Sequence, residues 1–338
     1  AAGTAAEAAA AENALMDAEM ESASVEQSPP PPSGAAPPPG YEVVGLDDDW
    51  QVVISGGHAV LPEGMTHLPD RAFQGRTSLF SVACPRSLVS IGIFAFDGCS
   101  SLVSIDLPAG LTSIGSSAFY GCSSLTSVTL PAGLTSIGNH AFLGCSALAS
   151  VTLPAGLTSI GSSAFYGCSA LTRVTFPAGL VSIRNYAFFG CTSLRSIHLP
   201  ASLTSIGSYA FLGCSALASV TLPAGLTSIG SSAFYGCSAL TRVTFPAGLV
   251  SIRNYAFFGC TSLRSIHLPA SLTSIGSYAF LGCSALASVT LPAGLTSIGS
   301  YAFCECTALT SINLPAGLTS IGWGAFEGCS GLTPSRGA

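Results

Sequence analysis

Apolar side chains recur along this chain with a fixed period of 23 residues. The pattern is complete between Pro108 and Leu130, and it repeats on both sides of that stretch without insertion or deletion. With the opening proline numbered 1, the large apolar positions are 4, 7, 12, 18, 21 and 23, here Leu111, Ile114, Phe119, Leu125, Val128 and Leu130. The opening proline recurs at Pro62, Pro85, Pro108, Pro131, Pro154, Pro177, Pro200, Pro223, Pro246, Pro269, Pro292 and Pro315. A repeat of this length predicts a solenoid in which every copy forms one coil stacked on the next.

Each copy is predicted to contain two short extended segments and one turn. The segment from Leu125 to Leu130 is typical of a short strand, and period-2 alternation points positions 20 and 22 away from the core. The proline that follows ends the strand because it has no N–H group to donate. A second extended segment covers Leu111 to Ile114. After it, at positions 9–15, we expect a single helical or 3-10 turn that brings Phe119 into the core.

The copies share a longer motif. Each reads I-G-x-x-A-F-x-x-C followed by L-x-x-[I/V]-x-L-P, with few departures, from Leu61 to about Leu332. This motif resembles the leucine-rich repeats of the BspA or Treponema pallidum type. The resemblance implies a curved, mainly β leucine-rich repeat solenoid of about twelve coils, with a parallel sheet on its concave face. It also implies a protein at the cell surface or secreted, which binds proteins or host matrix and has no enzymatic activity.

The N-terminal part of the chain differs from the repeats. Residues 1–40 are acidic and rich in alanine and proline, so we expect a disordered tail and linker there. Residues 41–61 are expected to form an N-terminal cap, and residues 62–338 the repeat array. Asp47, Asp48 and Asp49 lack the spacing of a calcium-binding loop and are interpreted as a solvated turn.

Cysteine is expected to serve as a core residue rather than as a ligand. Eleven of the thirteen cysteines occupy position 15, so they should form a ladder with neighbours about 4.8 Å apart. A disulfide requires Cβ atoms that face each other at about 3.8 Å, and a zinc site requires ligands that converge on one point. We therefore expect buried free thiols, no metal site and no cofactor.

Composition argues against several functional classes. No carboxylate lies between Asp106 and Glu305 to orient a histidine, so the chain is not expected to be an enzyme. No apolar run is long enough to span a bilayer. Lysine is absent, and the arginines of the central coils are not accompanied by aromatic side chains for base stacking, which argues against nucleic-acid binding.

Function is therefore expected on the outward-facing strand positions. Residues 141–209 are identical to residues 210–278, so any surface that the first block displays is displayed again three coils later. The candidate binding residues are Asp106, Thr129, Thr152, Arg173, Thr175, Arg195, His198, Thr221, Arg242, Thr244, Arg264, His267, Thr290 and Asn313. We interpret this face as a protein-interaction or adhesion surface, and its arginines favour an acidic protein partner.

Two other functions are compatible with the same repeat. The recurring Ser-x-Thr of positions 20 and 22 could act as a structural hydroxyl ladder that orders water or ice. Arg173, His198, Arg242 and His267 interrupt that ladder, which argues against this interpretation. An intracellular scaffold is the other alternative.

Overall fold

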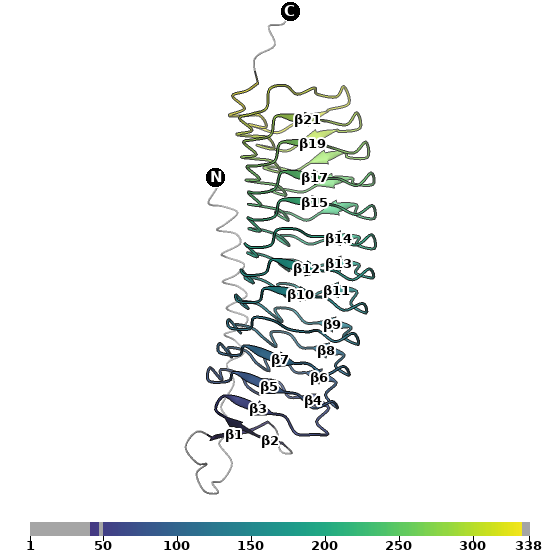
Figure 1. The fold of residues 1–338 in the computed structure, drawn as a ribbon. Coiled ribbons are helices and arrows are strands. Elements are labelled where there is room, and N and C mark those ends of the chain that lie inside the picture. Colours follow the sequence, from purple (N-terminus) through teal and green to yellow (C-terminus); the bar gives the residue numbers. More distant parts are fainter. Residues whose placement is uncertain (1–40, 47–49, 333–338) are drawn as a thin grey trace, which may run out of the picture. The chain divides into compact units, whose positions relative to one another are not determined.

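The structure is a computed structural model that describes residues 41–46 and 50–332. In this range the chain forms eleven complete coils and part of a twelfth, stacked one on another (Figure 1). The solenoid predicted from the 23-residue period is confirmed. The expected disordered tail at residues 1–40 and the expected turn at Asp47 to Asp49 lie outside the described residues.

Three strands precede the first coil: β1 (Tyr41–Gly45), β2 (Gln51–Ser55) and β3 (His58–Val60). β1 pairs antiparallel with β2, and β2 pairs antiparallel with β3. β3 then pairs parallel with β5 (Ser81–Ala83), the first strand of one of the two strand columns of the array. The edge of that column is therefore covered at the first coil, which protects it from pairing with another chain.

Two columns of parallel strands run along the array. The three-residue strands at repeat positions 20–22 define face A: β5 (Ser81–Ala83), β7 (Ser104–Asp106), β10 (Ser150–Thr152), β12 (Arg173–Thr175), β15 (Ser219–Thr221), β17 (Arg242–Thr244), β19 (Ser265–His267) and β21 (Ser288–Thr290). The two-residue strands at positions 6 and 7, with the turn residues at positions 8 and 9, define face B. These strands are β4 (His67–Leu68), β6 (Ser90–Ile91), β8 (Ser113–Ile114), β9 (Ser136–Ile137), β11 (Ser159–Ile160), β13 (Ser182–Ile183), β14 (Ser205–Ile206), β16 (Ser228–Ile229), β18 (Ser251–Ile252), β20 (Ser274–Ile275), β22 (Ser297–Ile298) and β23 (Ser320–Ile321). In both columns each residue pairs with the residue 23 positions further along the chain, so equivalent positions form straight rows.

The described residues contain no helix, so the segment at positions 9–15 is a turn and not a regular helical or 3-10 element. It keeps hydrogen bonds between residues three apart, such as that from the Tyr120 N–H to the Ser117 carbonyl at 3.1 Å, and it buries Phe119 as expected. The residue at position 10 has a left-handed backbone in every coil, as Ser117 does with φ of 55°, and position 14 is left-handed as well. Left-handed residues interrupt the regular dihedral angles that a right-handed helix needs. Alternate N–H groups of this turn instead point to the next coil: that of Phe119 donates to the carbonyl of Ala141 at 2.8 Å.

Phenylalanines at position 12 form a continuous column in the core. Neighbouring rings from Phe73 to Phe326 stack with their centroids 5.1–5.6 Å apart. The rings from Phe73 to Phe303 are completely buried. Because each ring packs on the rings of the coils before and after it, the burial of one coil depends on its neighbours.

The position-15 cysteines lie in the core as free thiols. Each donates to the phenylalanine carbonyl of the preceding coil, as Cys191 Sγ does to the Phe165 oxygen at 3.2 Å. Burial raises the pKa of the thiols from Cys99 to Cys283, to about 12 for Cys214 and well above the usual value for Cys191. In the last coil, the hydrogen bond with Cys306 instead lowers the pKa of the Cys329 thiol. The thiols from Cys99 to Cys283 stay protonated at neutral pH and act as small core groups, as the repeat pattern predicts.

Replacing Phe188 with alanine should remove one ring from the column and lower the free energy of unfolding by about 3 to 5 kcal/mol. Because coils are stabilised by their neighbours, the gap should also divide denaturant unfolding into two steps. The adjacent Phe189 lies at position 13 and is only half-buried, so Phe189→Ala is the matched control and should cost less. A single, unchanged transition for F188A would contradict stabilisation by neighbouring coils.

Position 14 is glycine in every coil except the eleventh, where Glu305 has a left-handed φ of 58°. A residue with a Cβ atom pays roughly 1 to 2 kcal/mol for this conformation. Glu305→Gly should therefore raise the free energy of unfolding by about 1 kcal/mol, seen as a higher thermal midpoint. Glu305→Ala removes the same charge but keeps the strained backbone, so an equal gain from E305A would show that the charge is responsible.

The thiol ladder can be tested by labelling. A thiol-specific reagent should modify few cysteines in the native protein, because burial keeps them protonated and inaccessible. It should modify nearly all thirteen in denaturant without reductant. Cys84, which is only half-buried, is the native site most open to the reagent. The C84S variant therefore measures how much the other cysteines are labelled in the native protein. Cysteines that remain blocked in denaturant would indicate disulfides.

Candidate interaction surface

Face A presents the outward side chains of the strands at positions 20–22. All fourteen candidate residues lie on or beside this face and all are exposed: Asp106, Thr129, Thr152, Arg173, Thr175, Arg195, His198, Thr221, Arg242, Thr244, Arg264, His267, Thr290 and Asn313. The valine or isoleucine between them at position 21 is buried from Val82 to Val289. Each strand is therefore fixed by its buried side chain while its neighbours point to solvent.

Backbone pairing arranges these side chains in rows. Arg173 is bridged to Ser196, Ser196 is bridged to Ser219, and Ser219 pairs with Arg242. The two arginines thus lie in one row, three strand spacings apart, or roughly 14 Å.

The hydroxyl groups of the array fall into two classes that the sequence did not separate. Those at positions 5, 16 and 19 commonly donate to carbonyls of the preceding coil; Thr112 Oγ1, for example, lies 3.2 Å from the Val89 oxygen. On face A, the hydroxyls of Ser219 and Thr221 have no such partner in the part of the chain that the structure describes. The first class contributes to coil stacking, and the second is free to hydrogen-bond with solvent or a ligand.

Basic side chains are concentrated at two places on face A. Patch 1 consists of Arg173, Arg195 and His198, and patch 2 repeats it three coils later as Arg242, Arg264 and His267. No arginine of either patch has an ion-pair partner among residues 41–46 and 50–332, where the one salt bridge joins Arg76 to Glu42. The guanidinium groups are therefore available for bidentate binding of carboxylates.

A shallow hollow lies on face A between Arg173 and Arg242. It measures about 520 Å³ and is lined by Ser196, His198, Leu199, Ala201, Ser219, Thr221, Pro223 and Ala224. Two of these residues, Ser196 and Ser219, are the ones that separate the arginines in their row. The surface between the two arginines is thus recessed, and its lining combines serine, threonine and alanine with the larger side chains of His198 and Leu199.

Near the N-terminal coils, face A carries the negative charge of Asp106 and not the positive charges of patches 1 and 2. Asp106 is exposed on β7, and the half-buried Cys84 lies one coil earlier at position 23. Burial, with a smaller contribution from the negative charge of Asp106, raises the pKa of the Cys84 thiol to about 12. Cys84 is therefore a protonated core-edge group and not a nucleophile at neutral pH.

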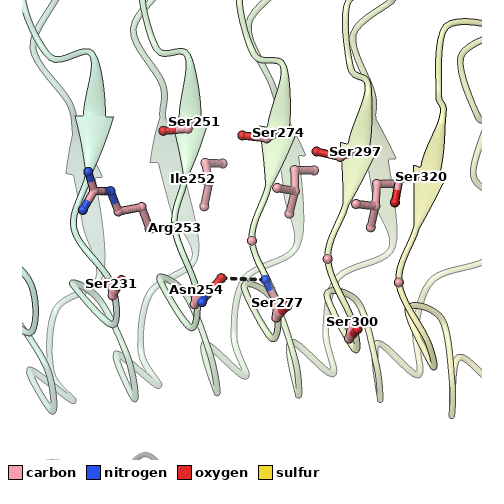
Figure 2. Close-up of a pocket in the computed structure, with 15 residues that line it drawn as sticks. Ser231, Ser251, Ile252, Arg253, Asn254, Ser274, Ser277, Ser297, Ser300 and Ser320 are labelled. Atoms are coloured by element: carbon pink, nitrogen blue, oxygen red, sulfur yellow. Dashed lines mark hydrogen bonds between the residues drawn. The ribbon is translucent and has the colours of Figure 1, made fainter.

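Face B carries a groove that the sequence analysis did not anticipate. Near the C-terminal coils it is a hollow of about 520 Å³, with serines of position 6 on one side and serines or asparagine of position 9 on the other (Figure 2). The Oδ1 of Asn254 accepts the N–H of Ser277 at 2.9 Å, which joins two coils along one wall. The floor is glycine because a Cβ on Gly276 would lie 2.6 Å from the Asn254 nitrogen. Coil packing alone therefore accounts for this groove.

Two histidine–serine pairs were also missed from the sequence. His58 Nδ1 lies 2.7 Å from Ser81 Oγ, and His67 Nδ1 lies 2.7 Å from Ser90 Oγ. Each pair joins residues 23 apart, so the repeat register itself could have revealed them. The nearby Asp70 uses its Oδ1 to accept the Ile93 N–H at 2.7 Å, so this carboxylate oxygen supports the turn.

No group of three or more histidine, cysteine or carboxylate side chains is placed to hold a metal ion in the described part of the chain. The same part contains no helix with the length and apolar character needed to cross a bilayer.

Comparisons with known proteins agree with this architecture. A family model described as BspA type leucine rich repeat region matches residues 57–169, 137–249 and 227–335. Among solved structures, the chain is similar to a leucine-rich repeat protein from Bacteroides ovatus, at 28% identity and a TM-score of 0.66. That match covers 86% of this chain and 91% of the other.

Two further solved structures share the fold at lower identity. A leucine-rich repeat protein from Eubacterium ventriosum is 22% identical, with a TM-score of 0.58 and coverage of 88% of this chain and 98% of the other. The pneumococcal vaccine antigen PcpA is 23% identical, with a TM-score of 0.55 and coverage of 79% and 74%. The search of curated proteins found no match. Because the family model spans nearly all of the repeat array, the chain belongs to the family of BspA-type leucine-rich repeat proteins.

Proposed function

We propose that the protein is a non-enzymatic, protein-binding solenoid, secreted or displayed at a cell surface, that uses face A for adhesion or partner capture. Membership of the BspA-type repeat family supports an interaction role. The observation that carries the proposal is the pair of exposed basic patches on face A, whose arginines have no carboxylate partner within the described residues.

Charge distribution supports an acidic partner. The stretch 107–304 contains six arginines and no aspartate or glutamate. Four of these arginines belong to patches 1 and 2, so much of the basic character of the central coils lies on face A. A surface of one sign attracts partners of the opposite sign and accelerates their association.

The remaining two arginines, Arg184 and Arg253, replace the usual glycine at position 8 on face B and are exposed. The substitution weakens coil contact there, since the Arg184 N–H lies 3.3 Å from the Ile160 oxygen, compared with 2.9 Å for Gly207 and Ile183. Arg184→Gly with Arg253→Gly therefore removes two positive charges outside face A and restores the residue that coil packing favours.

The test compares two variants that lose the same charge from different faces. In the first, Arg173→Ser, Arg195→Ala and His198→Thr give patch 1 the residues that the next coil already has at these positions. The second is the Arg184→Gly, Arg253→Gly control. The full chain and both variants are immobilised and exposed at low ionic strength to an extract of extracellular-matrix proteins, and the captured proteins are quantified.

We expect the patch 1 variant to capture clearly less of the acidic proteins than the full chain, with the remainder held by patch 2, and the control to retain them. The difference should shrink at about 0.5 M salt because exposed charge interactions are screened. Equal capture by the two variants would contradict the proposal. If both were reduced, net charge and not face A would determine binding; if neither were reduced, patch 1 would not contribute to it.

A further inference from the structure

The spacing of the two patches limits the kind of partner that can occupy both. Arg173 and Arg242 lie in one row with only Ser196 and Ser219 between them, so they are roughly 14 Å apart. A stable interface covers about 800 Å² on each partner, which corresponds to a region almost 30 Å across. Two separate globular partners would overlap on this face. The patches are therefore arranged for one ligand that reaches both.

The row runs along the axis of the array, perpendicular to the strands of face A. A polypeptide lying along it in extended conformation advances about 3.3 Å per residue and points alternate side chains to one side. Residues four apart in such a segment are on the same side and about 13 to 14 Å apart, which matches the arginine spacing. In a helix, residues seven, eight or eleven apart on one face are separated by about 10.5, 12 or 16.5 Å along the axis, so an extended segment matches the arginine spacing more closely.

The surface between the arginines can accommodate such a segment. The hollow of about 520 Å³ between them is lined by Ser196, Ser219 and Thr221, and also by His198, Leu199 and Pro223. The serine side chains leave room there for the backbone of a ligand. The hydroxyl groups of Ser219 and Thr221 have no partner among the described residues, so they can bond the peptide groups of a chain passing over them.

Resting on the function proposed above, we propose that Arg173 and Arg242 together bind one extended acidic segment of a protein partner, through two carboxylates spaced four residues apart. The segment crosses the Ser196–Ser219 hollow along the axis of the array. Patch 1 and patch 2 then act as a ruler that selects carboxylate spacing.

Three peptides of identical composition test this ruler. Each is a blocked nine-residue sequence of serine, threonine and valine with glutamate at residue 2 and a second glutamate at residue 4, 6 or 8. All three place both glutamates on the same side of an extended chain, so they differ only in the distance between carboxylates. Binding to the full-length protein is measured by fluorescence polarisation at low ionic strength.

The peptide with glutamates at 2 and 6 should bind about threefold to fivefold more tightly than the other two, as one additional exposed ion pair allows. Arg173→Ser and Arg242→Ser should each abolish this preference. Each of these substitutions installs the serine found at the same position in a neighbouring coil. The Arg184→Gly, Arg253→Gly protein should retain the preference.

A variant with a greater distance between Arg173 and Arg242 provides the decisive test. Inserting a second copy of residues 200–222 directly after Leu222 adds one coil between Arg173 and Arg242 and increases their separation to about 19 Å. Solenoids accept whole added repeats, because each repeat contacts only its neighbours. The preferred peptide should then be the one with glutamates at 2 and 8, whose carboxylates lie about 20 Å apart.

Equal binding of the three peptides, or a preference that the inserted coil does not shift, would overturn the ruler. Binding of dextran sulfate but of none of the peptides, with the same dependence on Arg173 and Arg242, would also overturn it and assign the row to an anionic polysaccharide. These outcomes are separate from the capture experiment. If capture depends on patch 1 but the peptides show no spacing preference, the protein-binding function is supported. Only the proposal of an extended acidic ligand is then rejected.

Discussion

The array depends on how closely the backbone of one coil approaches the backbone of the next. The approach is closest at position 8, where a Cβ on Gly230 would lie 2.4 Å from the carbonyl carbon of Gly207. At this separation the N–H groups of one coil reach the carbonyls of its neighbour in the strand columns of faces A and B and in the turn at positions 10, 12 and 14. Backbone polar groups are thereby paired along the whole length of the array. The phenylalanine column and the thiol hydrogen bonds repeat at the spacing that this contact sets.

The same constraint determines where the sequence can vary. Side chains that point along the axis or into the core must match those of the next coil, and they change little from copy to copy. Side chains at positions 20 and 22 leave the sheet at right angles to both directions. A serine, an arginine or a histidine at these positions alters neither the backbone hydrogen bonds between coils nor the core. Face A is therefore where polar and basic side chains differ from coil to coil. Arg184 and Arg253 are the exception, because they occupy a position where glycine packs best; at Arg184 the hydrogen bond to the preceding coil is longer.

The periodicity of the sequence is sufficient to predict the solenoid, the buried columns and the exposed rows, because equal spacing in sequence becomes equal spacing in space. It fails at the turn. Position 10 is left-handed whether it holds Ser117, His140 or Tyr186, so the conformation is imposed by the adjacent coils and not by the side chain that occupies it. The face B groove and the division of hydroxyls into bonded and free groups likewise depend on distances between coils. The exposure of the candidate residues at positions 20 and 22 followed directly from strand alternation, whereas the exposure of Arg195 and Arg264 at position 19 and the hollow between Arg173 and Arg242 required the structure.

The direction of the hydrogen-bond ladders has a mechanical consequence. The bonds that join coils run along the long axis of the array, so tension applied between its two ends loads the coil interfaces in series. One interface then gives way at a time, and each coil that opens converts roughly 5 Å of stacked height into up to about 80 Å of extended chain. A tethered array of this kind lengthens in steps and dissipates the work of pulling. The coils that have not opened keep face A intact while the load is carried.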